Sequence, residues 1–302
     1  MKMELSIIKI FAAKHPSSSF ILHPSSFLLL LVGALCSGCT STAPPKEQSR
    51  PRIEAERAYE NGQAAYKQKQ WISAANSFGK AADSFAAMDD YAIEATALHN
   101  QAQALRRAGQ IEESIASYQK SLALNQRLKR PLEQAQNLTG LAQCYRAQKK
   151  FDLAIQNSDD AMKLASSSRT LTSVIQNDLA LTLLQRGNKE DQDRIIQLLK
   201  SALKTSEAAG SSRARAANYL NLGRAWLQFG QNDSAENSLT KALDAFRAID
   251  DPAGLAQTHE QLAKLYRMSG NAEKAKFHLE HAREKYTFLK DEAGLKRIED
   301  AR

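Results

Sequence analysis

Few side chains in this sequence have the type and spacing that chemistry requires. His278 and His281 lie three residues apart, so on a helix they would share a face and offer two nitrogens to a metal ion. The sequence places no third ligand beside them, which favours surface histidines. His259 falls among helix-packing positions and is expected to be partly buried, and Cys144 is expected to pack between helices rather than react as a thiol.

Adjacent acidic residues occur twice, as Glu112-Glu113 and as Asp159-Asp160. Neighbours on a helix point in different directions, so neither pair brings two carboxylates face to face. The chain contains no P-loop, G-x-S-x-G or H-E-x-x-H string. The sequence therefore predicts a protein that is not an enzyme and that uses no metal or cofactor.

The charge of the chain is modest and mixed in sign. Its 302 residues include 41 Lys and Arg and 33 Asp and Glu, a formal net charge of +8, and basic and acidic residues alternate in most segments. There is no long basic run and no stripe of aromatic and basic residues, so no nucleic-acid partner is expected. Acidic protein partners remain compatible with this balance.

The N-terminus reads as an export leader. Lys2, Lys9 and Lys14 precede an apolar run over residues 27–35. Nine apolar residues suit the core of a signal peptide and are too few to span a bilayer as a helix. A leader over 1–38 is therefore predicted, followed by a proline-rich, flexible tether over 39–52.

The end of this run resembles the lipobox of bacterial lipoproteins, in which a small residue precedes a cysteine that becomes lipidated. Gly38 and Cys39 match that pattern and Ser37 is compatible with it, whereas Cys36 stands where the family usually has leucine. The resemblance implies lipidation at Cys39 and a membrane anchor, and Thr40 favours the outer membrane, facing the periplasm. A plain secretory signal and an uncleaved leader are the alternatives. A redox role for the Cys36 and Cys39 pair is not favoured, because both lie in the leader.

The rest of the chain, 53–302, contains an internal repeat. Each unit has an apolar helix, a turn that often carries glycine, and a second helix with small residues at fixed places. A small residue in the middle of each first helix recurs after 40, 40, 38, 43 and 40 residues. These six anchors are Gly62, Ala102, Ala142, Ala180, Gly223 and Ala263.

The pattern resembles the tetratricopeptide repeat, in a longer class of about 40 residues rather than about 34. The residues that carry the resemblance are Leu141-Ala142 with Tyr145, Leu222-Gly223 with Trp226, and Leu262-Ala263 with Tyr266. The resemblance implies an all-α fold, a right-handed α-solenoid of about six stacked antiparallel helix hairpins with a C-terminal capping helix. The expected repeats are 53–88, 90–128, 131–166, 169–209, 212–249 and 251–289, with the cap at 291–302.

The boundaries of these helices have their own signals. Glycines expected at the turn inside a hairpin are Gly109, Gly187, Gly230 and Gly270. Asp90, Asp251 and Asp291 suit the N-caps of first helices, and Pro131 and Pro252 suit the first helical turn. In the fourth repeat, about three extra residues between Gly187 and Ile195 predict a longer turn.

The resemblance also implies a concave binding face lined by the first helix of each hairpin. Arg106, Arg146 and Arg267 share one repeat position, which suggests a ladder for carboxylates. Leucines between them suggest an apolar patch. The alternative is that the arginines only solvate the surface. The residues carried over are Tyr59, Gln63, Tyr66, Lys67, His99, Gln103, Arg106, Arg107, Thr139, Gln143, Arg146, Asn177, Leu181, Leu184, Leu220, Arg224, Leu227, Glu260, Lys264 and Arg267.

These expectations combine into a scaffold or adaptor of the bacterial cell envelope that holds an extended protein or peptide segment, acidic at one end and apolar in the middle, in its groove. If the leader is misread, the same solenoid would be a soluble cytoplasmic regulatory or adaptor module. The likeness to other envelope lipoproteins is one of architecture alone, so the pathway stays open.

Overall fold

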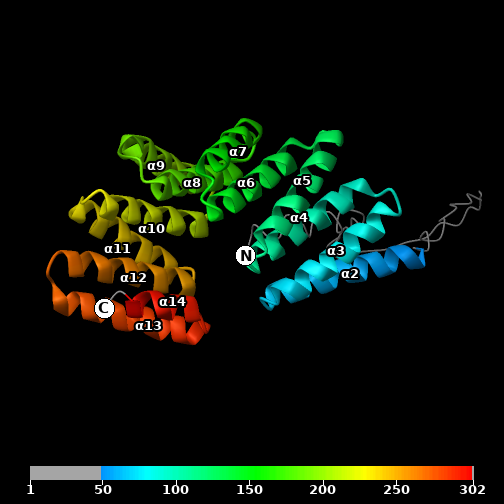
Figure 1. Cartoon of the computed structure of the whole chain (residues 1–302). Coiled ribbons are helices and arrows are strands. Elements are labelled where there is room, and N and C mark those ends of the chain that lie inside the picture. The colour runs from blue at the N-terminus through cyan, green and yellow to red at the C-terminus, as the bar shows by residue number, and fades with distance from the viewer. Residues whose placement is uncertain (1–48, 301–302) are drawn as a thin grey trace, which may run out of the picture. The chain divides into compact units, whose positions relative to one another are not determined.

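The computed structural model describes residues 49–300, and every regular element among them is helical. Figure 1 shows the helices following one another along the chain. Their bounds are α2 Arg50–Lys67, α3 Trp71–Ala86, α4 Tyr91–Arg107, α5 Ile111–Arg127, α6 Pro131–Ala147, α7 Phe151–Leu164, α8 Arg169–Arg186, α9 Gln192–Ala208, α10 Ser212–Gln228, α11 Asn232–Arg247, α12 Pro252–Met268, α13 Ala272–Leu289 and α14 Glu292–Asp300.

The helices pair into six hairpins, and each hairpin packs on the next. The first helices are α2, α4, α6, α8, α10 and α12, and the second helices are α3, α5, α7, α9, α11 and α13. Every second helix contacts both its own first helix and the first helix of the following repeat, and α14 packs on α13. The described part is an all-α solenoid of helical repeats, as the periodicity predicts.

Small residues set the distance between helices. A methyl group built on Gly62 would lie 2.7 Å from the ring of Phe78, in the second helix of the same hairpin. One built on Gly223 would lie 2.6 Å from the side chain of Leu239, at the corresponding place in the fifth repeat. Large side chains thus fill the space that the glycines leave, which produces close packing between antiparallel helices.

The turns inside the hairpins use left-handed backbone, as predicted. Gly109, Gly187, Gly230 and Gly270 have φ between +74° and +83°. In the first and third repeats the corresponding residues are Lys69 and Lys149, with φ of 60° and 59°. A side chain costs energy in this conformation, so the two lysines mark turns that the glycine pattern alone does not reveal.

The predicted caps form. Asp251 accepts hydrogen bonds from the backbone N–H groups of Ala253 and Gly254, both at 3.1 Å. Asp291 accepts one from Gly294 at 2.9 Å, and Asp90 a longer one from Ile93 at 3.4 Å. Pro131 and Pro252 each stand in the first turn of a helix, where a missing N–H costs nothing.

The fourth repeat has the expected longer turn. A short 3₁₀ helix, η1 Lys189–Asp191, separates Gly187 from α9. The guanidinium of Arg186 donates to the carboxylate of Asp191, with the shortest contact at 2.8 Å. This ion pair holds the turn against the end of α8. Ile195 fills the core where other repeats have an early small residue, and Leu199 takes the bulky position that Leu239 has in the fifth repeat.

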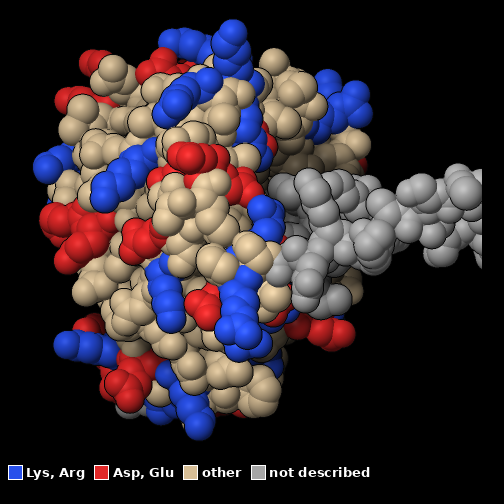
Figure 2. Space-filling view, turned by 90° about the vertical axis from the view of Figure 1, so that its right-hand side faces the viewer, with Lys and Arg blue, Asp and Glu red and all other residues tan. Residues whose placement is uncertain are grey.

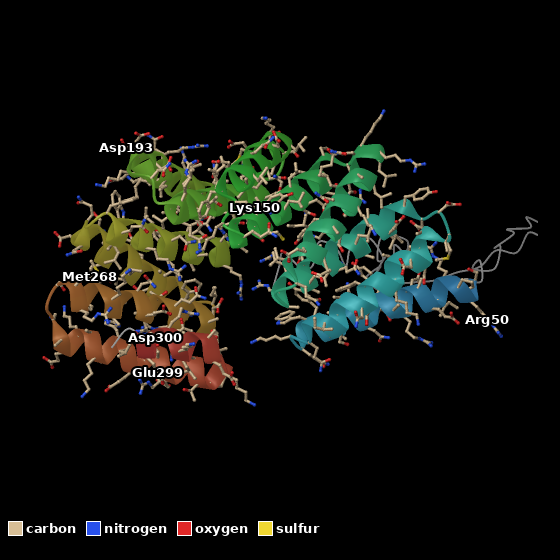
Figure 3. All side chains as sticks on the ribbon, viewed as in Figure 1. Arg50, Lys150, Asp193, Met268, Glu299 and Asp300 are labelled. Carbon is tan, nitrogen blue, oxygen red and sulfur yellow. The ribbon has the colours of Figure 1, made fainter. Side chains whose placement is uncertain are left out.

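The first described helix begins earlier than the sequence indicates. α2 starts at Arg50, three residues before the predicted boundary at 53, with Pro51 in its first turn. The leader, Cys36 and Cys39 lie outside the described residues. Within 49–300 no helix is long and apolar enough to cross a membrane. Figure 3 labels Arg50 and Asp300 at the two ends of this part.

Candidate partner-binding surface

The first helices form one continuous inner row. Contacts across repeats join α4 to α6, α6 to α8, α8 to α10 and α10 to α12. In the described part no two successive second helices come comparably close. Because the first helices are the closer set, they lie on the inside of the curve, and the row they form is the concave face that the repeat family predicts.

Side-chain hydrogen bonds join neighbouring helices along the first half of this row. The amide of Asn100 on α4 donates to the hydroxyl of Tyr59 on α2, with 2.7 Å between nitrogen and oxygen. His99 on α4 and Asn137 on α6 are 2.8 Å apart between Nδ1 and Oδ1. On the other side of the His99 ring, Nε2 lies 2.6 Å from the amide of Gln103.

The next junction, between α6 and α8, contains an ion pair. The guanidinium of Arg146 donates to the carbonyl of Asp178 at 3.2 Å and lies 3.5 Å from its carboxylate. Gln143 donates to the same carboxylate. Asp178 is 8% exposed. Arg146 and Gln143, both predicted to bind a partner, are therefore bonded to one buried acidic residue of the protein itself.

Hydrogen bonds continue along the second half of the row. Asn221 on α10 donates to Asn177 on α8 at 3.0 Å. Arg224 donates back to Asn221 and forward to Gln257 on α12, both at 3.2 Å. Burial lowers the pKa of Arg224, but its bonds run to amides rather than to a carboxylate. All five junctions between the first helices are therefore tied by polar side chains.

The prediction of an exposed apolar patch in the groove is wrong for two of its four leucines. Leu220 and Leu227 are each 3% exposed and lie in the core formed by α10, α11 and α12. Leu181 and Leu184 are half-buried on α8. The prediction failed because the stacking of α10 on α12 turns these leucines toward the next repeat, which single-helix positions do not show.

Two aromatic residues predicted for the groove of the first repeat, Tyr59 and Tyr66, are packed against other rings, and Gln63 is hydrogen-bonded to Tyr59. Tyr59 is 3% exposed, and its ring meets Phe78 edge to face at 5.4 Å. Burial raises its pKa to about 12, opposed by the hydrogen bonds of Asn100 and Gln63. Tyr66 packs edge to face on Trp71 at 5.0 Å. These residues support the groove more than they line it.

The predicted arginine ladder separates into different roles. Arg146 is paired with Asp178, whereas Arg106 has no acidic partner among the described residues. Arg106 lies against the hydroxyl of the buried Tyr118, whose pKa burial raises and Arg106 lowers. Arg267 is exposed at the end of α12.

The predicted groove residues that stay both exposed and charged are basic, and the exposed Glu60, two turns before Lys67, is an acid on the same face of α2. The side chains of the basic residues reach solvent, and none of them forms an ion pair with a described residue. Lys67 and Arg107 occupy the same repeat position on α2 and α4, 40 residues apart. The four exposed basic residues are Lys67, Arg107, Lys264 and Arg267.

Residues that the sequence interpretation missed are the polar partners of the row. Asn100, Asp178 and Asn221 all stand two places before the anchor of their repeat. That recurrence of an amide or acid is a signal present in the sequence. Asn137 and Gln257 lie outside this register, and only the stacking of the hairpins brings them into contact with the neighbouring first helix.

The isolated chemistry-bearing residues are placed as follows. Cys144 is fully buried, with Sγ 3.3 Å from the hydroxyl of Ser114, and burial raises its pKa, as suits a packing residue. His278 is not the surface residue predicted: it packs on the buried His259. Among residues 49–300 no group of three or more His, Cys, Asp or Glu is arranged to hold a metal ion.

Charge on the visible surface shows no single-sign field. Figure 2 shows blue and red side chains interleaved over one face of the molecule. On the second helices, ion pairs join Asp159 to Arg194 at 3.4 Å and Asp160 to Lys163 at 2.7 Å. The predicted role of these aspartates as solvated acids agrees with their positions.

The fold and the inner row define a solenoid of helical hairpins built to contact other proteins. Two family models described as tetratricopeptide repeat match residues 95–128 and 215–287. The chain is a tetratricopeptide repeat protein, and repeats of this kind form scaffolds for protein–protein interaction.

Solved structures share this fold over most of the chain. RapI in its apo form matches with a TM-score of 0.65 and 14% identity, covering 82% of this chain and 87% of RapI. A Rap protein complexed with Competence and Sporulation Factor has a TM-score of 0.64 and 14% identity, with 84% and 75% covered. BtubC from P. vanneervenii has a TM-score of 0.58 and 18% identity, with 80% and 93% covered. None of the curated proteins matches the chain in sequence.

Proposed function

We propose that this protein is a scaffold or adaptor of the bacterial cell envelope that binds an extended, acidic segment of a partner protein along its inner row. The observation that carries the proposal is the charge left over after the internal bonds are made. Lys67 and Arg107 at one end of the row, and Lys264 and Arg267 at the other, have no acidic partner among the described residues. Carboxylates on a bound segment would supply those partners.

The rigidity of the row supports the same proposal. Hydrogen bonds that Asn100 and Asn221 donate and Asp178 accepts hold successive first helices at fixed spacing. A surface fixed before binding loses little conformational entropy when a segment settles on it. The likeness to a Rap protein complexed with Competence and Sporulation Factor supports binding by this fold in general, and it does not identify a partner here.

Charge reversal on the row tests the acidic segment. The partner is first isolated by photo-crosslinking from Gln103 in native cells and identified by mass spectrometry, and its affinity is then measured. Lys67→Glu with Arg107→Glu should weaken binding at least about tenfold, since each removes an attraction and adds a repulsion. Both side chains are exposed, so folding should survive.

A matched control uses the second helices. Lys80 and Lys120 are also exposed and also 40 residues apart, on α3 and α5. Lys80→Glu with Lys120→Glu changes the net charge by the same amount on the opposite side of the hairpins. Equal losses of affinity in both double variants would contradict a site on the inner row and indicate only long-range charge steering.

The envelope location is proposed from the lipobox resemblance at Cys39. Cys39→Ser should release the protein from the membrane fraction, whereas Cys36→Ser should leave it there. If wild type is already soluble, the lipid anchor is refuted. The compartment from which the protein is released then decides between an exported, periplasmic protein and the alternative function of a cytoplasmic adaptor module. This outcome would leave the inner-row proposal intact, because that proposal depends only on residues 49–300.

A further inference from the structure

Three histidines meet in the last hairpin, where the sequence shows only a pair. His259 on α12 and His278 on α13 are 2.9 Å apart between their Nδ1 atoms, and their ring centroids are 5.1 Å apart. The ring of His281, one turn further along α13, is also 5.1 Å from that of His259. We call His259, His278 and His281 the histidine cluster.

The short contact inside the cluster has a strict proton requirement. Two imidazole nitrogens 2.9 Å apart can share a hydrogen bond only if one carries a proton and the other does not. When both rings are protonated, both nitrogens are donors, so the bond is lost and two positive charges face each other. His259 is 6% exposed, so water cannot easily take over as its partner.

The surroundings compensate only partly for a positive charge on His259 or His278. Arg247 on α11 and Lys285 on α13 lie near His259, and Lys274 lies near His278. Glu236 on α11 opposes the lowering of the pKa of His278, and its carboxylate accepts the hydroxyl of Tyr266 at 2.5 Å.

Glu284, the other acid nearby, lies 3.5 Å from the outer ring, that of His281, and not from the short contact. Burial, and then the charge of the other histidines, lower the pKa of His259 to about 3. The same causes lower the pKa of His278 to about 4.

His99 differs from these two histidines in its hydrogen-bond partners. It is half-buried and also has a pKa lowered by burial, but its two ring nitrogens face the side-chain amides of Asn137 and Gln103. An amide can present its oxygen to a protonated ring. His259 and His278 have only each other.

We propose that the histidine cluster makes the C-terminal hairpin an acid-sensitive latch, so that α12, α13 and α14 open on mild acidification while α2 to α11 stay folded. Stacked repeats contact only their neighbours, so a terminal hairpin can open alone. Met268, labelled in Figure 3, ends α12, and the histidine cluster lies between that helix and α13. The opening removes Lys264 and Arg267 from the inner row.

The direction and size of the pH effect on the opening of this hairpin follow from proton linkage. In the open hairpin each histidine regains an ordinary pKa of about 6.5, so the open form binds more protons below that pH. The closed form is therefore favoured above about pH 6.5 and loses stability as the pH falls toward the lowered values. Between about pH 7.5 and pH 5, each freed histidine favours opening by about 30-fold.

Hydrogen exchange followed by mass spectrometry measures this opening in the full chain. Labelling at about pH 7.5 and about pH 5, with times scaled for the intrinsic exchange rate, should show an opening constant in α12 and α13 that rises at least about tenfold. The hairpin of α8 and α9 contains no histidine, and the hydrogen bonds of His99 and of the histidine cluster go to other helices, so it is the internal control. It should change by less than about threefold.

A double variant isolates the cause. His259→Asn with His278→Asn keeps a donor and an acceptor at the short contact and cannot titrate, so the acid-induced rise should disappear. An equal rise in this variant would overturn the proposal. So would a wild-type α12 and α13 that respond to pH no more than α8 and α9, a comparison that needs no variant to fold.

Discussion

Gly140→Ala is expected to destabilise the solenoid by about 1–2 kcal/mol. Gly140 on α6 packs against the ring of Tyr118 on α5, across the junction of the second and third repeats. A methyl group at this position would lie 2.5 Å and 2.7 Å from the ring carbons Cε1 and Cε2 of Tyr118. Tyr118 is 1% exposed and its ring also meets His99 edge to face, so it has no space to retreat.

The magnitude is a difference between two opposing effects. Overpacking a buried site typically costs about 1–3 kcal/mol, because side chains or backbone must shift. Alanine favours a helix interior over glycine by about 1 kcal/mol. Because the ring of Tyr118 cannot move aside, the cost of overpacking should exceed the helix preference of alanine. The melting temperature should then fall by about 2–8 °C for a folded region of this size.

Gly79→Ala is the matched control. Gly79 also lies inside a helix, α3, but the atom that a methyl group would meet is the amide nitrogen of Gln101, at 2.5 Å. This is the far end of a flexible side chain, whose hydrogen bond from Ser117 at 3.1 Å is the only one to give up. The helix preference should then win, leaving this variant as stable as wild type or up to about 1 kcal/mol more stable.

Thermal unfolding of both variants, followed by far-UV circular dichroism, decides the matter. Both variants add one methyl group, yet Gly140→Ala should lower the melting temperature and Gly79→Ala should leave it unchanged or raise it. If Gly140→Ala melts with or above wild type, the ring of Tyr118 does not set the distance between repeats. If Gly79→Ala is the less stable of the two, Gln101 cannot move aside more easily than the ring of Tyr118.

Three further substitutions are predicted, each measured as a change in the free energy of unfolding. Gly109→Ala meets no atom within 4 Å but places a side chain at φ +83°, so it should cost about 1–2 kcal/mol from backbone strain alone; no loss would mean that the turn relaxes. Asp178→Ala removes the carboxylate that Gln143 donates to and Arg146 pairs with, although Arg146 keeps the backbone carbonyl, and should cost about 1–3 kcal/mol; Asp193→Ala, at an exposed residue of α9, should cost close to nothing. Asp251→Ala removes two capping bonds and should cost about 1–2 kcal/mol, whereas Asp251→Asn should keep most of the cap.

The fold was predictable because its determinants are local and recur. Glycine at a left-handed turn, as at Gly187, and aspartate at an N-cap, as at Asp251, act within a few residues of their own position. The small residues that let helices approach recur every 40 places or so. Each such feature indicates the same hairpin, which is why the sequence alone predicts helix pairs in the right places.

The binding surface was less predictable because it depends on how one hairpin is set against the next. Leu227 has the repeat position of a groove residue, yet the neighbouring repeat buries it. Arg146 has the position of a ligand-binding arginine, yet Asp178 in the next first helix pairs with it. The histidine cluster joins residues 19 apart, His259 and His278, on two helices whose facing sides the sequence does not specify.

Site-specific photo-crosslinking in native cells tests the central claim, that partners bind on the inner row. Crosslinking residues are placed at Arg107 and Lys264, exposed on α4 and α12, and at Gln119 and Thr240, exposed on second helices. Crosslinks from Arg107 and Lys264 to one common partner, with Gln119 and Thr240 giving none, are the predicted result. Crosslinks to that partner from the second helices, with none from Arg107 or Lys264, would contradict it.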